Sequence, residues 1–213
     1  MATKKLFREE PYKRRCEAVV TSLKGKEITL DQTIFFAFAG GQASDRGTIG
    51  GIPVKESKVV GDEIVYQLET EPPFKEGDKV TICLDYKRRE KLMRLHSATH
   101  LVYFIFNEMV GNPELIGSNV SEEKGRLDYH YPENIAPLLI EIEKKVNTII
   151  EQDWVIKTYP DEKKRDKWWW VCGKWKCPCG GTHVSSTKEI GEVRLKRRNI
   201  GAGKERIEIY VKS

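Results

Sequence analysis

Histidine is scarce in this sequence, and long apolar runs are absent. The 213 residues include four histidines, and no stretch approaches the eighteen consecutive apolar residues that a membrane-spanning helix needs. The first residues, Met1–Lys5, lead into further charged residues without the apolar core of a signal peptide. We therefore expect a cytoplasmic protein without a membrane partner. With 39% hydrophobic residues, the chain can build a core for one large or two small domains.

The cysteine count does not suit a secreted disulfide framework. There are five cysteines, which is an odd number, and Cys172, Cys177 and Cys179 fall within eight residues of one another. Such crowding favours metal or redox chemistry.

Two of the four histidines lie four residues apart in a predicted helix. Apolar residues recur at helical spacing from about 91 to 109, and His96 and His100 would lie one turn apart on one helical face, where they could bind one metal ion. A metalloprotease signature would place Glu after the first histidine, but this position is Ser97, so the peptidase reading loses its general base. On its own, such a pair of histidines is also typical of residues at the edge of the hydrophobic core on an amphipathic helix.

A second half-site follows about eighty residues later. Cys179 and His183 offer a thiolate and an imidazole at a spacing that suits one ion, so three of the four histidines lie in these two short motifs. Together the motifs predict a zinc centre with one cysteine and three histidine ligands. The alternative is a closed zinc knuckle formed by Cys172, Cys177, Cys179 and His183.

The first part of the chain, residues 1–87, is predicted to be a small β-barrel or sandwich. Short alternating segments are separated by Gly and Asp turn signals, and no helical period lies between them. The predicted strands are residues 16–23, 27–30, 63–68 and 79–84.

A glycine-rich segment, residues 39–51, interrupts these strands. Its five glycines allow backbone N–H groups to approach a ligand closely. It is neither a Walker loop nor a dinucleotide-binding turn. A flexible hairpin tip is the other interpretation. The residues that we single out as candidates for contact with a ligand are Gly40, Gly41, Gln42, Ser44 and Asp45.

Residues 88–213 are predicted to form an α+β domain. Apolar residues at helical spacing indicate a second helix over 132–153. We expect one sheet with helices on one side and the two metal half-sites at its edge. Three consecutive tryptophans, Trp168–Trp170, would alternate between the faces of a strand, so at least one should be core. The predicted strands are 126–129, 154–159, 168–171, 189–195 and 206–211.

The net charge of +5 is unevenly distributed. Residues 174–212 contain ten Lys or Arg against four Asp or Glu. This distribution indicates a polyanion as a partner, although a solvated basic face is an equally simple explanation.

The motifs resemble those of the alanyl-tRNA editing proteins, the AlaX group related to the editing domain of alanyl-tRNA synthetase. Residues 96–100 (HSATH) and 179–184 (CGGTHV) are similar to its two zinc motifs, and residues 40–47 are similar to the glycine-rich motif of its medium-length members. The family's stretch between the two zinc motifs is similar to Gly117-Ser118 and residues 126–129 here. The glycine-containing run that closes its domain is similar to residues 201–208. The resemblance covers about residues 30 to 210.

This resemblance implies a fold, an activity and a cofactor. The fold would be an N-terminal β-barrel followed by an editing domain of the threonyl/alanyl-tRNA synthetase type. The activity would be trans-editing: deacylation of mischarged tRNA(Ala) at its acceptor end, removing serine and glycine, with one zinc ion per chain. Zinc would either activate water or position the substrate.

The substrate pocket is predicted from hydroxyl groups near the zinc motifs. Thr99 and Thr182 are candidates for shaping the pocket, and Ser118 for contact with substrate or tRNA. A polar contact made only to serine could favour it over alanine by roughly 10⁴-fold. Both threonines could instead bond to nearby carbonyls. Asp128 and Arg126 are predicted to be structural ion-pair members.

Other interpretations stay open at this point. One is an editing hydrolase for seryl-tRNA(Thr), and another is a non-catalytic zinc-stabilised tRNA-binding module. The sequence departs from the family pattern at Ala39 and Glu114, and the additional thiol of Cys177 could compete for the metal.

Overall fold

The chain forms two compact units, and the division falls between Glu90 and Lys91. The computed structural model describes residues 2–164 and 166–212. Glu90 lies within a helix, three residues beyond the predicted end of the β domain. The domain limits 1–87 and 88–213 stay a prediction.

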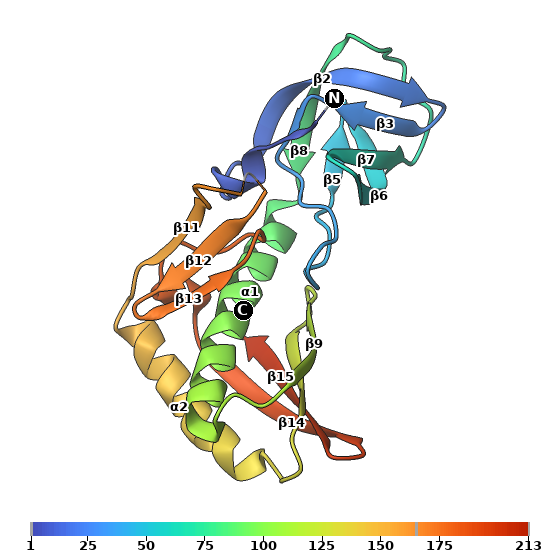
Figure 1. Cartoon of the computed structure of the whole chain (residues 1–213). Helices are drawn as coiled ribbons and strands as arrows, with labels where there is room; N and C mark the ends of the chain where they lie inside the picture. Colours follow the sequence, from blue (N-terminus) through green and yellow to red (C-terminus); the bar gives the residue numbers. More distant parts are fainter. Residues whose placement is uncertain (1, 165, 213) are drawn as a thin grey trace. The chain divides into compact units, whose positions relative to one another are not determined.

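The first unit is built from short antiparallel strands. Six strands form a closed barrel in the order β2-β3-β7-β6-β5-β8, while β1 and β4 pair separately (Figure 1). Burial alternates along β7, where Ile64, Tyr66 and Leu68 face the barrel core. The elements are β1 (Lys4–Lys5), the short helix η1 (Leu6–Arg8), β2 (Arg15–Lys24), β3 (Glu27–Leu30), β4 (Gln32–Thr33), β5 (Gly47–Ile49), β6 (Ile52–Val60), β7 (Glu63–Leu68) and β8 (Lys79–Leu84).

The helix α1 (Tyr86–Val110) begins five residues before its predicted start. Asp85 precedes it and accepts a hydrogen bond from the backbone N–H of Arg88 at 3.2 Å, as an N-cap residue does. The charged residues Lys87, Arg88 and Arg89 therefore form the first turn of α1.

The second unit has two sheets instead of the single sheet that we predicted. A four-stranded sheet has the order β14-β15-β10-β9, and a three-stranded sheet has the order β11-β12-β13. The α+β composition is as predicted. After α1, the elements are β9 (Leu115–Val120), β10 (Gly125–His130), α2 (Ala136–Glu151), β11 (Ile156–Pro160), β12 (Trp168–Cys172), β13 (Trp175–Pro178), η2 (Thr187–Ile190), β14 (Val193–Gly201) and β15 (Lys204–Val211).

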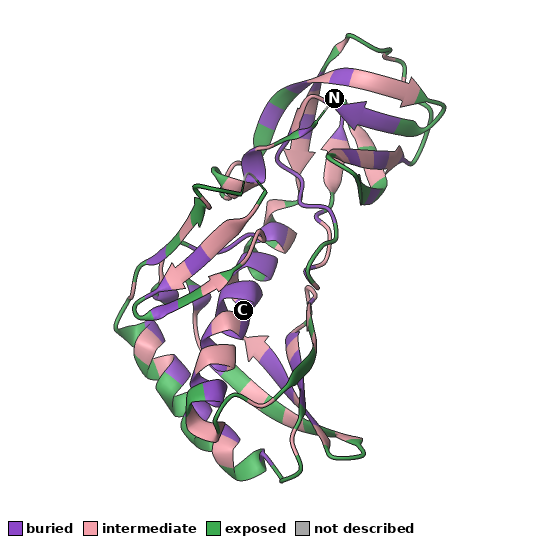
Figure 2. Cartoon of the chain, in the orientation of Figure 1, coloured by how far each residue is buried: buried purple, intermediate pink, exposed green. Residues whose placement is uncertain are grey.

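One hydrophobic core joins both sheets to both helices in this unit. It includes Leu101 and Phe106 of α1, Ile142 of α2, Ile207 of β15 and Trp170 of β12. The helix α2 buries one side and exposes the other, whereas α1 is buried over much of its length (Figure 2). No helix among the described residues is long and apolar enough to cross a membrane.

Candidate metal centre

Four side chains from distant parts of the sequence converge in the second unit. His96 and His100 project from one face of α1, Cys179 directly follows β13, and His183 lies in the loop before η2. Their nitrogen and sulfur atoms all lie within 4.8 Å of one another.

The distances within this group suit a small tetrahedral ion. The Cys179 Sγ lies 3.6 Å from His96 Nε2 and 3.2 Å from His183 Nε2. Tetrahedral zinc, with its usual bond lengths to sulfur and nitrogen, separates such ligands by about 3.5 Å. The group is therefore arranged as a Cys/His₃ site would require.

The imidazoles are in the form that binds a cation. Burial lowers the pKa of His96 to about 4, and it holds the pKa values of His100 and His183 well below their usual range. Among the described residues, none forms a hydrogen bond with the buried Nε2 of His100, which is costly unless a ligand occupies its lone pair. Burial also raises the pKa of the Cys179 thiol to about 11, so a cation is what would favour its thiolate.

Two neighbouring side chains orient the histidine rings. The Ser97 Oγ lies 3.4 Å from His183 Nδ1 and accepts the Val184 backbone N–H at 3.3 Å. The Cys177 Sγ lies 3.5 Å from His100 Nδ1. Both contacts engage Nδ1, so when Nδ1 carries the ring proton and donates it, the Nε2 lone pair is left for a metal ion. The role of Ser97 was not predicted, because Ser97 was considered only as the residue that replaces a catalytic Glu.

Aromatic rings form one wall of the centre. The His100 ring stacks on Trp170 with centroids 4.7 Å apart, and Trp170 stacks in turn on Phe104 at 5.9 Å. Trp170 is fully buried. These rings fix the plane of His100 and exclude water from the side facing the core.

The structure does not favour the zinc knuckle that the sequence left open. Cys172 is a buried member of the hydrophobic core, and within the described residues the candidate metal group contains neither Cys172 nor Cys177. Cys177 contacts the ring of His100 from outside this group.

The predicted pocket hydroxyls have different surroundings. Thr99 donates its hydroxyl proton to the Leu95 carbonyl at 2.7 Å, as in the structural interpretation. Thr182 is buried beside His183. Ser118 is exposed on β9, which is an edge strand. Their roles toward a substrate stay predictions.

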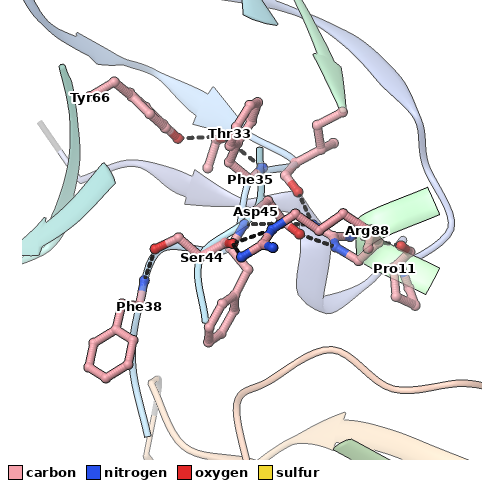
Figure 3. A network of polar contacts seen from close by, with 11 residues as sticks. Pro11, Thr33, Phe35, Phe38, Ser44, Asp45, Tyr66 and Arg88 are labelled. Carbon is pink, nitrogen blue, oxygen red and sulfur yellow. Dashed lines mark hydrogen bonds and ion pairs between the residues drawn. The ribbon is translucent and has the colours of Figure 1, made fainter. Parts of the chain in front are cut away.

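The glycine-rich segment is held by buried polar contacts within the first unit (Figure 3). Asp45 forms a fully buried ion pair with Arg89 and accepts the Phe36 backbone N–H at 2.6 Å. Ser44 accepts the Phe38 backbone N–H at 2.8 Å. The carbonyl of Ser44 also accepts two bonds from Arg88, at 3.0 and 3.1 Å.

Two of the predicted ligand-binding residues are buried. Gln42 and Asp45 are 0% and 4% exposed, and contact between a ligand and either side chain stays a prediction. Gly40 and Gly41, with φ values of 56° and 84°, form the outer turn, where only residues that tolerate positive φ fit easily. Contact between a ligand and Gly40, Gly41 or Ser44 stays a prediction.

Asp128 is a structural ion-pair member, as predicted. Its carboxylate binds Arg126 Nη1 at 2.7 Å, and it binds Arg206 at 2.7 and 2.9 Å. Arg126 lies on the same strand, β10, whereas Arg206 is the register partner of Asp128 on β15, so its contact joins two neighbouring strands.

Comparison with known proteins first defines the class. Residues 171–208, which contain Cys179 and His183, match the model of the threonyl and alanyl tRNA synthetase second additional domain. The chain is 35% identical over 230 residues to the alanine–tRNA ligase of Methanococcus vannielii and 34% identical over 237 residues to that of Staphylothermus marinus. These alignments cover 97% and 99% of this chain but 26% of each ligase, so the chain spans about a quarter of their length.

A full-length relative then gives the family. The chain is 38% identical over 213 residues to the alanyl-tRNA editing protein AlaX-M of Pyrococcus horikoshii, and the alignment covers 98% of each protein. The chain belongs to this family of alanyl-tRNA editing proteins.

Proposed function

We propose that the chain is a zinc-dependent aminoacyl-tRNA deacylase that acts in trans. Its substrate would be tRNA(Ala) carrying serine, or glycine, and it would hydrolyse the ester that joins this amino acid to the acceptor end. The proposal rests on the group formed by His96, His100, Cys179 and His183 in a chain that aligns with nearly all of an alanyl-tRNA editing protein. The editing-domain type of fold, and the cytoplasm as its location, belong to the same proposal.

Zinc suits this donor set, because three neutral imidazoles and one thiolate are borderline-soft ligands. The buried Nε2 of His100, with which none of the described residues forms a hydrogen bond, supports a bound cation. When bound, zinc supplies a Lewis acid that polarises the ester carbonyl and favours ionisation of a nearby water.

The chain itself orients the histidine rings and covers one side of the centre with an aromatic ring that excludes water. Ser97 and Cys177 hold the Nδ1 atoms of two rings, and Trp170 covers the face of His100. An aminoacyl ester is already activated, so holding the reacting groups in place can account for much of the rate enhancement.

Thr182, which directly precedes His183, is a candidate for recognising the serine hydroxyl, as is Thr99. Thr99 already donates its proton to a carbonyl, so its oxygen can only accept another bond. Thr182 is 1% exposed and adjacent to His183. A contact that only serine completes would leave a polar group unpaired when alanine binds, which disfavours alanine. Glycine would be accepted through the permissive size of the pocket.

The test is the release of labelled amino acid from charged tRNA. Zinc-loaded protein would be incubated with seryl-tRNA(Ala), glycyl-tRNA(Ala), alanyl-tRNA(Ala) and seryl-tRNA(Thr), beside the variants His96→Ala and His100→Ala. We expect seryl-tRNA(Ala) to lose its serine and alanyl-tRNA(Ala) to stay charged. Both variants should lose zinc and activity while their circular dichroism is unchanged.

A matched control is available in His130. This histidine is exposed on β10, with its Nε2 3.9 Å from a Glu114 carboxylate oxygen, and it is not part of the metal group. His130→Ala should retain zinc and full activity.

Two outcomes would replace the proposal. Release of serine from seryl-tRNA(Thr) instead would favour the second hydrolase, a candidate because the matching family model describes both threonyl and alanyl enzymes. Binding of tRNA without deacylation, unaffected by His96→Ala, would indicate a non-catalytic module.

A further inference from the structure

The three-stranded sheet β11-β12-β13 has two chemically different faces. Residues pair in register as Tyr159↔Trp169↔Pro178 in one row and Lys157↔Val171↔Lys176 in the next. These rows share the face opposite Trp170, which packs on His100. The core-side face therefore belongs to the metal centre, whereas the other face carries lysines and aromatic rings.

Two lysines lie against one aromatic ring on this outer face. Lys167 Nζ lies 3.9 Å and Lys176 Nζ 4.3 Å from the Trp169 ring centroid. Lys176 Nζ also lies 5.3 Å from the centroid of Tyr159, which is 39% exposed. We name Tyr159, Lys167, Trp169 and Lys176 the Lys–Trp face.

A carboxylate holds the central ring in place. The Trp169 indole N–H donates to Asp161 Oδ2 at 2.8 Å. Asp161 also accepts hydrogen bonds from the backbone N–H groups of Lys163 and Lys164. These bonds lower the pKa of the Asp161 carboxyl, and the nearby charge of Lys167 lowers it by a smaller amount. Asp161 therefore positions the ring, and its carboxylate also attracts the Lys167 ammonium group.

The two lysines are available to an external anion. Among the described residues, no carboxylate oxygen lies within ion-pairing distance of Lys167 or Lys176. Exposed Lys157, Lys163 and Lys164 add further positive charge around them, and Glu162 and Asp166 offset part of it. Lysines held beside an exposed ring (Tyr159) and a half-buried ring (Trp169) are a combination that can bind a nucleic-acid strand, since they offer cations to phosphates and ring edges to bases.

The Lys–Trp face adjoins the metal centre along the same strands. Cys179 follows Pro178, whose register partner is Trp169, and the Cys179 backbone N–H donates to the Trp168 carbonyl at 2.9 Å. The Lys–Trp face and the metal centre therefore use the same strands, β12 and β13, on opposite faces of the sheet.

We propose that the Lys–Trp face binds the phosphate backbone of the tRNA acceptor end, next to the terminal nucleotide whose ester is hydrolysed. This inference rests on the proposed function for the identity of the polyanion. The face itself is defined by the charge, the exposed rings and the shared strands. Lys167 and Lys176 would contact phosphates, and Tyr159 and Trp169 would position the lysines and offer their exposed edges to bases.

The test is equilibrium binding of uncharged tRNA(Ala) to the zinc-loaded full chain over a series of salt concentrations. The variant is Lys167→Gln/Lys176→Gln, and the matched control is Lys144→Gln/Lys145→Gln on α2, which removes the same charge from another element. Each lost phosphate contact reduces the slope of log affinity against log salt by about 0.7 to 0.9. We expect a slope reduced by about 1.4 to 1.8, and binding at 0.1 M salt weaker by roughly tenfold or more.

The control should retain most of the wild-type slope and affinity. Trp169→Leu should weaken binding while leaving the slope unchanged, because no charge is removed. Zinc content and thermal unfolding of each variant would establish that it is folded. Equal losses in the face variant and the control, or an unchanged slope in the face variant, would overturn the proposal.

Deacylation kinetics separate this inference from the proposed function. If the enzyme is active, Lys167→Gln/Lys176→Gln should raise KM for seryl-tRNA(Ala) and leave kcat nearly unchanged, because the centre is intact. If the wild-type protein binds tRNA with the expected salt dependence but hydrolyses nothing, the proposed role of the Lys–Trp face is supported and the proposed hydrolase activity is refuted. If the wild type hydrolyses its substrate and the Lys167→Gln/Lys176→Gln variant binds tRNA normally, the hydrolase activity is supported and the role of the Lys–Trp face is refuted.

Discussion

Breaking the buried ion pair between Arg89 and Asp45 should strongly destabilise the first unit. Both side chains are fully buried. The Arg89 guanidinium also donates to the Ile34 carbonyl at 2.5 Å and to the Pro11 carbonyl at 2.8 Å. Arg89→Met would remove these donors and leave the Asp45 carboxylate in the core without its cation.

The expected loss of folding free energy comes from the Asp45 carboxylate, which stays in the core without its partner. A buried carboxylate that loses its partner typically costs about 3 to 5 kcal/mol of folding free energy. Replacing both partners with apolar residues removes the uncompensated charge and can approach neutrality. Arg89→Met/Asp45→Leu should therefore be more stable than Arg89→Met alone, although Phe36 would lose the acceptor for its backbone N–H.

Urea unfolding of the full chain, followed by circular dichroism and tryptophan fluorescence, would measure both changes. The five tryptophans all lie between residues 154 and 175, so fluorescence reports the second unit and circular dichroism reports both. A suitable control is Glu141→Gln, which breaks an exposed pair with Lys145 at 2.7 Å and should cost less than about 1 kcal/mol. A loss below about 1 kcal/mol in Arg89→Met, or no recovery in the double variant, would refute the reasoning.

Three further predictions concern the second unit. Cys177→Ala should weaken zinc affinity by about tenfold in a chelator competition, because His100 loses its Nδ1 partner; unchanged affinity would show that the contact is incidental. Gly125→Ala should cost about 1–3 kcal/mol in urea unfolding, because an added Cβ would overlap Thr99 Oγ1, and Thr99→Ala should restore part of the loss unless the strain lies elsewhere. Glu208 has a lowered pKa, first because a lysine ammonium donates to it at 2.6 Å. Its stabilising effect should thus be present above the unfolded pKa near 4.3 and disappear as pH falls through the lower folded pKa. Glu208→Gln should reduce stability at pH 7 and approach the wild type near pH 3, whereas a difference that persists at pH 3 would exclude this linkage.

The four members of the metal group could be found from the sequence because each half of the group is local. Histidines four apart on a helix share a face whatever the rest of the fold does, and Cys179 and His183 lie within one short loop. The contacts that orient their rings could not be found in this way. Ser97 meets His183 across 86 positions in the sequence, and Cys177 meets His100 across 77.

The glycine-rich segment shows what local composition does not reveal. Small polar residues among glycines are typical of a ligand-binding loop, and Gln42 and Asp45 were assigned to ligand contact on that basis. The partner of Asp45 is Arg89, 44 positions later in the sequence, near the start of α1. Burial of a charge is decided by its partner, and a sequence pattern does not identify a partner so distant.

The three consecutive tryptophans became interpretable only with the strand register. Because successive side chains point to opposite faces, Trp170 faces the core and stacks on His100, while Trp169 lies on the outer face with its two lysines. A slip of one residue in β12 would exchange these environments, placing the lysine-bound ring in the core and the histidine-stacking ring in solvent. The same register of β12 therefore places Trp170 against the metal centre and Trp169 in the Lys–Trp face on the other side of the sheet. Substitutions at adjacent positions can thus act on metal binding and on the proposed RNA contact separately.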